Sequence, residues 1–565
     1  MLFVPLHQGS SSPLSRIPFS VSLCQPLKPG HALRAREQHN NTSTHNQSGP
    51  PLIHVVVLPN GPSSKVVCNH CLAHNVPTKA CTGCKAVAYC GASCQKANWG
   101  LIHKNECKSF KKVKSSVDQD WLPTPVRALL QVLLRWDSEP ELRSAFETLE
   151  GNVSKFKQRE DVWKDIGLQA YGGMVYAGRT ENDEQLHLAR DILCKVQTNS
   201  FDRTDADTGQ AGVFLHPTLA MVNHSCIPNA NVTFNKRQAL LRAEAPIKEG
   251  DEINISYIDY TKPKLFRQLG LALYHFNCSC PRCKDDLTVY EVCQRSPVIP
   301  LNSFSLVPNL QSLREPPTNL PKTKKGLQEL KDSIDEIYIA CQPPDSSQSP
   351  RSIPQRLTYL QHQWRQCQPL IRAGMWAQEP LSLTVEHAIM YYTEIGSYAH
   401  ALSLACFAAL HCAPYKYPAP FMERRLKGLM VIAKTLTNTA PPSAMEQLTK
   451  MSDHRVMVCL LQADQVAICE ALALMVEKYG TMAHSEEWEI LDLARSMLKD
   501  IASLPGREKE AGLLRAWAGS RDEAGTKYFK DQILMPIKDL AGFAVDIMTT
   551  DFDTDEPLLE VDKVD

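Results

Sequence analysis

The chain has 565 residues, of which 43% are hydrophobic and 22% are charged. One hydrophobic core rarely serves so long a chain, so we expect roughly three or four structural units. Lys plus Arg and Asp plus Glu each number 61, so no net charge directs the chain to nucleic acid or a membrane. No apolar run reaches the length of a membrane span, and we expect no membrane partner.

The first 50 residues are predicted to be largely irregular. Residues 1–36 lack acidic side chains and resemble a transit peptide, but a disordered tail is the interpretation we favour. The polar stretch from Glu37 to Gly49 is also typical of disorder. The β-branched run from Leu52 to Leu58 is the first candidate for a buried strand.

The 20 cysteines favour metal binding over disulfides, because they cluster in Cys-x2-Cys pairs and no secretion signal is visible. Eight metal ligands follow the first strand, and they are Cys68, Cys71, Cys81, Cys84, Cys90, Cys94, His103 and Cys107. Eight such ligands fill two closed, tetrahedral zinc sites. Metal binding would supply the folding energy that so short a segment lacks. The last two pairs have i, i+4 spacing, so each pair is expected on one face of a helical turn.

A basic strip follows these ligands, formed by Lys104, Lys108, Lys111, Lys112 and Lys114. Phe110 is the only aromatic residue among them, so a solvated helix face is favoured over a nucleic-acid surface. Nucleic acid therefore remains an alternative partner with little support.

Residues 121–200 are predicted to be helical, because apolar residues recur at helical spacing from Val126 to Leu134 and from Leu186 to Val196. Short strands separated by turn residues are expected next, over residues 213–215, 231–234, 239–242 and 252–257. In the last of these, Ile253, Ile255 and Tyr257 alternate with polar neighbours and should share one face.

A polar segment, Asn223-His224-Ser225-Cys226, lies among these strands. Amide, imidazole, hydroxyl and thiol groups together suit neither a core nor a solvated turn, so the segment indicates a site. Further on, Cys278, Cys280 and Cys283 offer three thiolates that need a fourth ligand, and Cys226 is the obvious candidate. One zinc ion on all four would hold the polar segment against this cluster and help to form a pocket.

The rest of the chain is predicted to be helical. Pro and Ser accumulate in residues 297–321 and 342–354, which indicates linkers around a helix near Lys325 to Tyr338. From Gln355 onward the pattern is all-helical, and residues 388–402 have the helix-turn-helix pattern of tetratricopeptide-like repeats. Because the period is irregular, we expect stacked helical hairpins and not a regular array.

In combination these features resemble the SET-and-MYND group of protein lysine methyltransferases. The resemblance rests on the eight-ligand segment, Asn-His-Ser-Cys, the Tyr-x-Asp-Tyr sequence from Tyr257 to Tyr260, the Cys-x-Cys-x2-Cys cluster and the helical C-terminal region. It covers residues 52–285 closely and the helical region loosely. It implies an α+β multidomain fold: a β-rich SET domain with an inserted MYND zinc finger and helical insert, a cysteine-rich post-SET zinc site, and an all-α tetratricopeptide-like C-terminal domain.

The resemblance also implies domain boundaries. They are an N-terminal tail with an atypical first part of the SET domain (1–67), the MYND finger (68–107), the SET domain (108–260) with its helical insert, the post-SET zinc region (261–285), a Pro/Ser-rich linker with a helix (286–354), and the helical domain (355–565).

The cofactors implied by the resemblance are S-adenosylmethionine and three zinc ions. In the MYND finger the ligand pairs interleave, so that Cys68, Cys71, Cys90 and Cys94 bind one zinc and Cys81, Cys84, His103 and Cys107 bind the other. Cys226, Cys278, Cys280 and Cys283 match the third zinc site.

The site residues are likewise carried over from the resemblance. The cofactor-binding candidates are Asn223, His224, Phe276 (stacked on adenine), Glu150, Asn152 and Asn199. Two channel tyrosines are the catalytic candidates: Tyr257 orients the acceptor amine and cradles the methyl group, while Tyr274 forms the channel wall and could assist deprotonation. A general-base role for His224 is the weaker idea, since the family uses that position for cofactor contact.

The sequence departs from the family in its opening loop, Gly-x-Gly-Leu-x-Ala. The nearest equivalent runs from Gly30 to Ala35, where Ala32 replaces the second glycine and His31 is the candidate cofactor contact. Two functions therefore stay open: an active lysine methyltransferase, or an inactive scaffold that binds partners through its finger and helical domain. We expect a protein substrate, histone or other, proline-rich or other proteins at the finger, a monomer, and a location in nucleus and cytoplasm.

Overall fold

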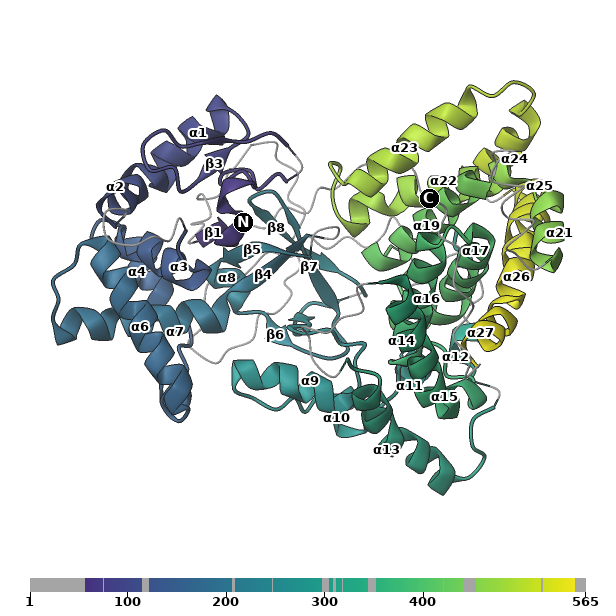
Figure 1. Cartoon of the computed structure of the whole chain (residues 1–565), viewed down its shortest axis with the longest axis horizontal. Coiled ribbons are helices and arrows are strands. Elements are labelled where there is room, and N and C mark those ends of the chain that lie inside the picture. Colours follow the sequence, from purple (N-terminus) through teal and green to yellow (C-terminus); the bar gives the residue numbers. More distant parts are fainter. Residues whose placement is uncertain are drawn as a thin grey trace. The chain divides into compact units, whose positions relative to one another are not determined.

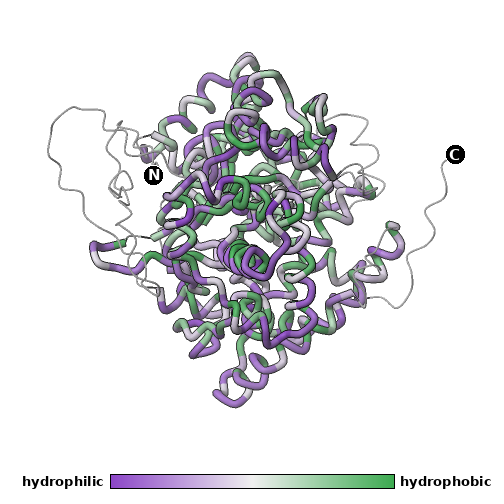
Figure 2. Tube along the Cα trace, turned by 90° about the vertical axis from the view of Figure 1, so that its left-hand side faces the viewer, coloured by the Kyte–Doolittle hydropathy of each residue, from purple (hydrophilic) through white to green (hydrophobic). Residues whose placement is uncertain are grey.

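The computed structural model describes residues 56–553, apart from 75, 114–120, 206–208, 246, 297–303, 308–310, 318, 344–351, 420, 440–453 and 520–521. These residues form two compact units. The first contains residues 56–257 and 271–278, and the second contains residues 258–270 and 279–553. Figure 2 shows hydrophilic and hydrophobic residues alternating along the individual helices, which is the pattern of helices that bury one face.

The first unit begins with a small, cysteine-rich segment, drawn in purple and dark blue in Figure 1. Its regular elements are η1 (Pro62–Lys65), β2 (Lys79–Ala80), β3 (Ala88–Tyr89), α1 (Ala92–Asn98), the π-helical turn η2 (Trp99–His103) and α2 (Lys104–Val113). The shared helical turn expected for Cys90 and Cys94 is wrong, because Cys90 precedes the helix and the extended Gly91 (φ −171°) caps it. The expectation holds for His103 and Cys107, which lie on the continuous helical stretch of η2 and α2.

Residues 121–200, called the helical insert below, are a set of helices as predicted. These helices are α3 (Thr124–Leu133), α4 (Pro140–Glu147), α5 (Val153–Lys157), α6 (Glu160–Ala177) and α7 (Asp183–Asn199). Helix α3 is buried from Val126 to Leu133 and packs against both α6 and α7. A side chain at Gly173 of α6 would come within 2.5 Å of Leu129, so glycine permits this close packing.

Strands of the first unit are short and form four small sheets. The largest is antiparallel, in the order β1-β5-β4, and comprises β1 (Val56–Pro59), β5 (Gly209–Leu215) and β4 (Phe201–Asp205). Gly212 on β5 faces the Leu58 carbonyl so closely that a Cβ atom would lie 2.0 Å from its oxygen. The predicted strand at 52–58 is confirmed for residues 56–58, whereas β4 was not predicted.

The polar segment lies in the second group of strands. After α8 (Pro217–Ala220), β6 (Asn223–His224) pairs in parallel with β9 (Asn254–Ile255). The antiparallel hairpin of β7 (Ala230–Asn235) and β8 (Gln238–Ala243) lies between them in the chain, as predicted. The strand expected over 252–257 is shorter than predicted. Ile253 and Ile255 are nevertheless buried in one core, against which Tyr257 is packed.

Every regular element of the second unit that the structure describes is helical. They are α9 (Lys264–Leu271), α10 (Pro281–Lys284), α11 (Val289–Arg295), α12 (Gln311–Arg314), α13 (Lys324–Ala340), α14 (Ile353–Gln366), α15 (Gln368–Arg372), α16 (Leu381–Glu394), α17 (Tyr398–Phe407), η5 (Ala408–Cys412), α18 (Ala413–Lys416), α19 (Glu423–Thr439), α21 (His454–Gln462), α22 (Gln465–Ala483), α23 (Glu489–Ala502), α24 (Glu508–Gly519), α25 (Glu523–Tyr528), η6 (Phe529–Leu534), α26 (Met535–Gly542) and α27 (Ala544–Phe552). Helix η3 (Ala272–Tyr274) returns to the first unit.

The helices of the second unit follow the predicted pattern with two differences. The helical pattern from His454 to Tyr479 forms two helices, because the side chain of Asp464 accepts a hydrogen bond from Ala467 and starts a new helix. A short helix, α12, lies within the predicted linker at 297–321. No single described helix is long and apolar enough to cross a membrane; α21 and α22 meet that test only as a pair bent by 78°.

Candidate functional site

Three groups of four ligand residues are brought together by the structure. They are Cys68, Cys71, Cys90 and Cys94; Cys81, Cys84, His103 and Cys107; and Cys226, Cys278, Cys280 and Cys283. Within each group the ligand atoms lie within 4.8 Å of one another. These are the three groups that the resemblance implied, including the interleaved order of the first two.

The spacing of the ligand atoms fits tetrahedral zinc. With Zn–S bonds of about 2.3 Å, two thiolates on one zinc should lie roughly 3.8 Å apart, and a thiolate and an imidazole nitrogen about 3.6 Å. The Cys71–Cys90 and Cys90–Cys94 sulfur distances are 3.7 and 3.6 Å. In the second group the Cys84 sulfur lies 3.6 Å from Nε2 of His103. The donor sets and distances therefore suit zinc, and they are closed sites without an open position for substrate.

Backbone N–H groups favour the thiolate form of one member of the first group, Cys68. Burial alone would raise the pKa of the Cys68 thiol, but hydrogen bonds from the backbone of Cys90, Cys71 and His70 lower that pKa to about 7. The thiolate is the form that binds a metal, so these backbone hydrogen bonds favour metal binding by Cys68.

The polar segment is tied to Tyr257 through His224. The backbone N–H of Tyr257 donates to Nδ1 of His224 over 3.1 Å, and Nε2 of His224 lies 3.3 Å from the sulfur of Cys226. Because Nδ1 accepts a hydrogen bond, the ring proton of a neutral His224 lies on Nε2 and points to that sulfur. His224 thus connects a zinc-ligand candidate to the backbone of a catalytic candidate, and neither ring nitrogen is placed to act as a general base.

Four aromatic side chains gather around this segment, one of them the histidine itself. The ring centroids of Tyr257 and Tyr274 are 4.9 Å apart, and His224 lies 5.3 Å from Tyr257 and 5.9 Å from Phe276. The hydroxyl of Tyr257 donates a 2.6 Å hydrogen bond to the carbonyl oxygen of Val222. The structure therefore brings together His224, Tyr257, Tyr274 and Phe276, four of the predicted site residues, which lie up to 52 positions apart in the sequence.

Both phenols of the group are held in the neutral form. Burial raises the pKa of the Tyr257 phenol far above its usual range, and Tyr274 and Glu252 raise it further by charge repulsion. Burial also raises the pKa of Tyr274, with a further contribution from Asp202. At neutral pH the two tyrosines therefore act as hydrogen-bonding dipoles and not as charged bases.

The helical insert supplies the second part of the candidate site. The amide of Asn199 donates to the Glu150 carbonyl over 2.7 Å, and the Glu150 carboxylate accepts a 3.3 Å hydrogen bond from the backbone of Asn152. Asn152 is buried and adopts a left-handed backbone conformation (φ 50°) at the start of α5. The three predicted residues Glu150, Asn152 and Asn199 thus form one local cluster.

This cluster is joined to the aromatic group by α5. Lys155 donates from Nζ to the carbonyl of His275 over 3.0 Å, and Phe156 packs edge-on against the His275 ring at 4.5 Å. His275 lies between Tyr274 and Phe276 and also has a left-handed backbone (φ 61°). The sequence analysis missed Lys155 and His275, because residue type alone reveals neither the contact between them nor the left-handed backbone.

Of the two remaining cofactor-binding candidates, the structure describes Asn223 but not His31. Asn223 is exposed and donates from its amide to the Glu252 carboxylate over 2.8 Å, so Glu252 is a further site residue that the sequence analysis missed. His31 and the loop from Gly30 to Ala35 lie outside the described residues.

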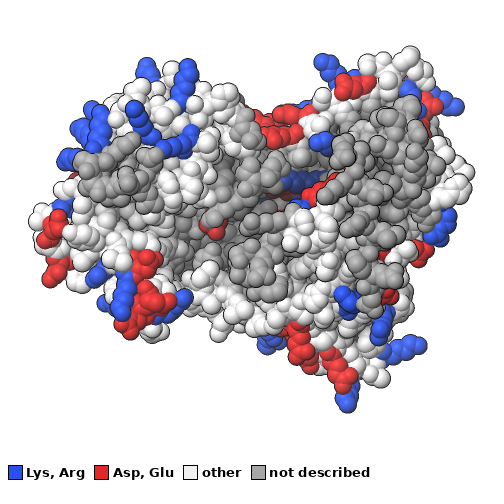
Figure 3. Space-filling model, in the orientation of Figure 1, with Lys and Arg blue, Asp and Glu red and all other residues white. Residues whose placement is uncertain are grey.

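The basic strip lies on the surface of α2. Lys104, Lys108, Lys111 and Lys112 are exposed, whereas Lys114 lies outside the described residues. Between Pro62 and Val113 the only acidic residue is Glu106, which is buried. On the face shown in Figure 3, blue side chains accordingly gather around this cysteine-rich segment without red ones among them.

The comparisons with known proteins agree with this geometry. Residues 68–107 match the MYND finger family, and both ligand groups of the cysteine-rich segment fall within that range. Residues 68–107 are a MYND finger. The two interleaved ligand groups that the structure shows therefore lie inside the matched finger.

A wider part of the chain is similar to SET-and-MYND proteins. It is 32% identical over 250 residues to "SET domain and MYND-type zinc finger protein 6" of Schizosaccharomyces pombe, covering 44% of this chain and 50% of that protein. It is 35% identical over 229 residues to the human "Histone-lysine N-methyltransferase SMYD3" (39% and 52% covered) and 29% identical over 225 residues to the human "N-lysine methyltransferase SMYD2" (38% and 50%).

The chain thus spans about half the length of the curated relatives that it matches. The resemblance to the SET-and-MYND group is confirmed, and the relatives include proteins named as lysine methyltransferases.

Proposed function

We propose that the protein is a protein-lysine N-methyltransferase that uses S-adenosylmethionine as methyl donor. The observation that carries the proposal is the position of Tyr257, whose hydroxyl is fixed on the Val222 carbonyl beside His224, Tyr274 and Phe276. The relatives named as lysine methyltransferases support the same reaction class. In this proposal, residues 108–260 with 261–285 form a SET domain and its post-SET zinc region.

The candidate site has unsatisfied polar atoms that suit a polar cofactor. Oγ of Ser200 and Nε2 of His275 are buried and have no hydrogen-bond partner among the described residues. Ser200 follows Asn199, and His275 precedes Phe276, so both atoms lie beside residues proposed to hold the cofactor. A buried polar atom without a partner is costly, and a bound nucleoside with amino-acid groups could satisfy both.

Each residue then has a defined part in the proposed reaction. Bound S-adenosylmethionine supplies an electrophilic methyl group on a sulfonium. The partly exposed face of Phe276 can stack on adenine, while Asn152, Asn199 and Asn223 offer amide groups to the polar parts of the cofactor. His224 holds the backbone at Tyr257 and keeps the aromatic group together.

The tyrosines act on the acceptor lysine. The amine must be neutral and in line with the methyl–sulfur bond, so orientation contributes more than acid–base catalysis. An apolar aromatic channel disfavours the ammonium ion and lowers the lysine pKa. The hydroxyl of Tyr257 and the Val222 carbonyl can then align the amine lone pair, while Tyr274 closes the channel wall and excludes water.

Cofactor binding provides the first test. Saturating S-adenosylmethionine should raise the melting temperature of the full chain, because a ligand that binds only the folded state stabilises it. The same sample should transfer labelled methyl groups to lysine peptides on an array, which would also identify the substrate. Absence of any thermal shift would refute the proposal and favour a scaffold that binds partners through its finger and helical region.

A further inference from the structure

A single carboxylate is buried inside the MYND finger, next to a zinc ligand. Glu106 is fully buried and is the only acidic residue between Pro62 and Val113. Its Oε2 atom lies 2.9 Å from Nδ1 of His103, the one imidazole among the finger's eight ligands. A carboxylate is excluded from water at high cost unless it is fully paired, so its partners are informative.

His103 is oriented by this contact. Its Nε2 atom lies 3.6 Å from the Cys84 sulfur, on the side where the other ligands of the group converge. Nδ1 therefore carries the ring proton and donates it to Glu106, which leaves the Nε2 lone pair for the metal. Glu106 selects the tautomer and the ring orientation that zinc requires.

The second partner of Glu106 comes from outside the finger. Arg127 on α3 donates from Nε to Oε1 over 2.6 Å and from Nη2 to Oε2 over 3.1 Å, which is a two-pronged ion pair. Gln131, one turn further along α3, adds a 3.2 Å hydrogen bond to Oε1. Arg127 and Gln131 are themselves buried, so the helical insert neutralises the finger's only carboxylate.

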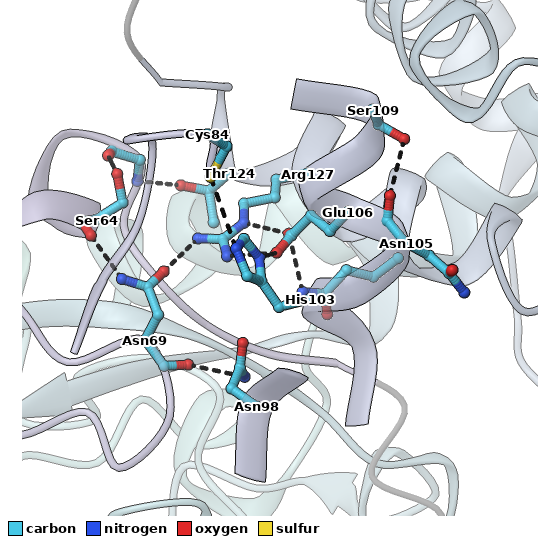
Figure 4. A network of polar contacts seen from close by, with 12 residues as sticks. Ser64, Asn69, Cys84, Asn98, His103, Asn105, Glu106, Ser109, Thr124 and Arg127 are labelled. Carbon is cyan, nitrogen blue, oxygen red and sulfur yellow. Dashed lines mark hydrogen bonds and ion pairs between the residues drawn. The ribbon is translucent and has the colours of Figure 1, made fainter. Parts of the chain in front are cut away.

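The same arginine also reaches the other zinc group. Nη1 of Arg127 donates over 2.7 Å to the side-chain oxygen of Asn69, which lies between the ligands Cys68 and Cys71. The amide of Asn69 donates in turn to the backbone carbonyls of Ser64, Val67 and Ala88. Figure 4 shows this network running from His103 through Glu106 and Arg127 to Asn69.

We propose that Glu106 and Arg127 are positioning residues for the zinc site of His103, and that through them zinc occupancy of the finger is coupled to helix α3. The finger would then not be an independent module, because its second zinc and the helical insert stabilise each other. This inference is independent of methyl transfer and would stand in a protein without that activity.

Zinc affinity of a Glu106→Gln variant tests the positioning role. Glutamine keeps the size of the side chain but leaves Arg127 without a charged partner, and loss of such an outer contact weakens metal binding by about 10- to 100-fold. We expect chelator competition to release one zinc of three more readily. In the Co²⁺-substituted protein, the absorption of the site with the histidine ligand should change, and that of the two all-cysteine sites should not.

An ion pair on the surface of the same unit serves as a control. Asp137 forms a 2.8 Å ion pair with Arg179, which also donates to the Leu133 carbonyl at the end of α3 without touching the finger. Asp137→Asn should leave all three zinc ions and the cobalt spectrum unchanged. Zinc release from Glu106→Gln that matches the wild type, or that affects all three sites equally, would overturn the positioning role.

Coupling to α3 is tested on the wild-type chain, which avoids any folding failure of a variant. Hydrogen exchange of residues 124–133 should accelerate when a chelator removes one zinc, before the other two are lost. The double variant Glu106→Gln with Arg127→Met removes both charges; it should recover thermal stability relative to Glu106→Gln but not zinc affinity. Unchanged exchange in α3 after loss of that zinc would overturn the coupling.

Discussion

The hydroxyl of Tyr257 donates to the carbonyl oxygen of Val222, the residue directly before Asn223 and His224. This bond fixes a phenol at the position where we propose that the acceptor amine is aligned. Tyr257→Phe keeps the ring and its packing but removes the hydroxyl. We expect methyl transfer to fall by about 100-fold or more, as for loss of one preorganised polar group, while the thermal shift with S-adenosylmethionine persists. Retained activity would remove Tyr257 from the mechanism.

His224 is predicted to act through position and not through proton transfer. Its two ring nitrogens contact the Tyr257 backbone and the Cys226 sulfur, so His224→Gln should lower methyl transfer without changing its pH dependence. The measurement is kcat/KM between about pH 6.5 and pH 9.5. A general base would instead be revealed by loss of the pH-dependent limb in the variant.

Three zinc ions per chain are predicted from the three ligand groups. Elemental analysis should return three for the wild type and two for Cys226→Ala. Cys194 offers a matched control, because it is equally buried but belongs to the helical core and to none of the ligand groups. Cys194→Ala should therefore retain three zinc ions. Two zinc ions in the wild type would rule out the group at Cys226.

Two variants of Asn152 distinguish a role of its backbone conformation in stability from a role of its amide in cofactor binding. Its left-handed conformation is strained for most side chains, so Asn152→Ala should lower the free energy of unfolding by about 1 kcal/mol, and Asn152→Gly should not. If the amide contacts the cofactor, both variants should bind S-adenosylmethionine more weakly. Normal titration of the glycine variant in calorimetry would show that only the backbone matters.

Glu244 should make stability depend on pH. Burial raises the pKa of its carboxyl to about 8. The folded state then holds a proton that the unfolded state releases, and stability falls as pH rises from about 4.5 to about 8. Glu244→Gln removes this contribution, so the melting temperature of the variant should rise relative to that of the wild type as the pH increases from about 5.5 to about 8. A constant difference would contradict the burial effect.

Local spacing explains why much of the finger could be predicted. The ligand types and their intervals all lie within residues 68–107, so they indicated two zinc sites before any fold was known. The helices of the insert and of the second unit could be predicted equally well, because the spacing of their apolar residues is a local property of the sequence. The prediction for Cys90 was wrong because the extended Gly91 caps α1, so that Cys90 lies between β3 and this helix and not within it.

Long-range pairing explains what could not be predicted. Strand β6 has only two polar residues and exists because Asn254 and Ile255 lie beside it, 31 positions away. Nor does residue type reveal that both nitrogens of His224 are used, or that Arg127 reaches across to Glu106. The sequence did contain one indication of the Glu106–Arg127 ion pair. Glu106 is a lone acidic residue in a lysine-rich segment, and Arg127 is a charged residue within the apolar run of α3.

The interleaved order of the zinc ligands has a consequence for proteolysis. Lys85 is exposed and lies after Cys84, so trypsin cleavage there would leave two ligands of each zinc on either side of the cut. Cleavage at the exposed Lys79 or Lys96 would still leave one zinc bridging the fragments. A nicked finger should therefore migrate as one species under native conditions, held by the shared zinc ions as well as by β1 in its sheet, so that the metals act as cross-links of the chain.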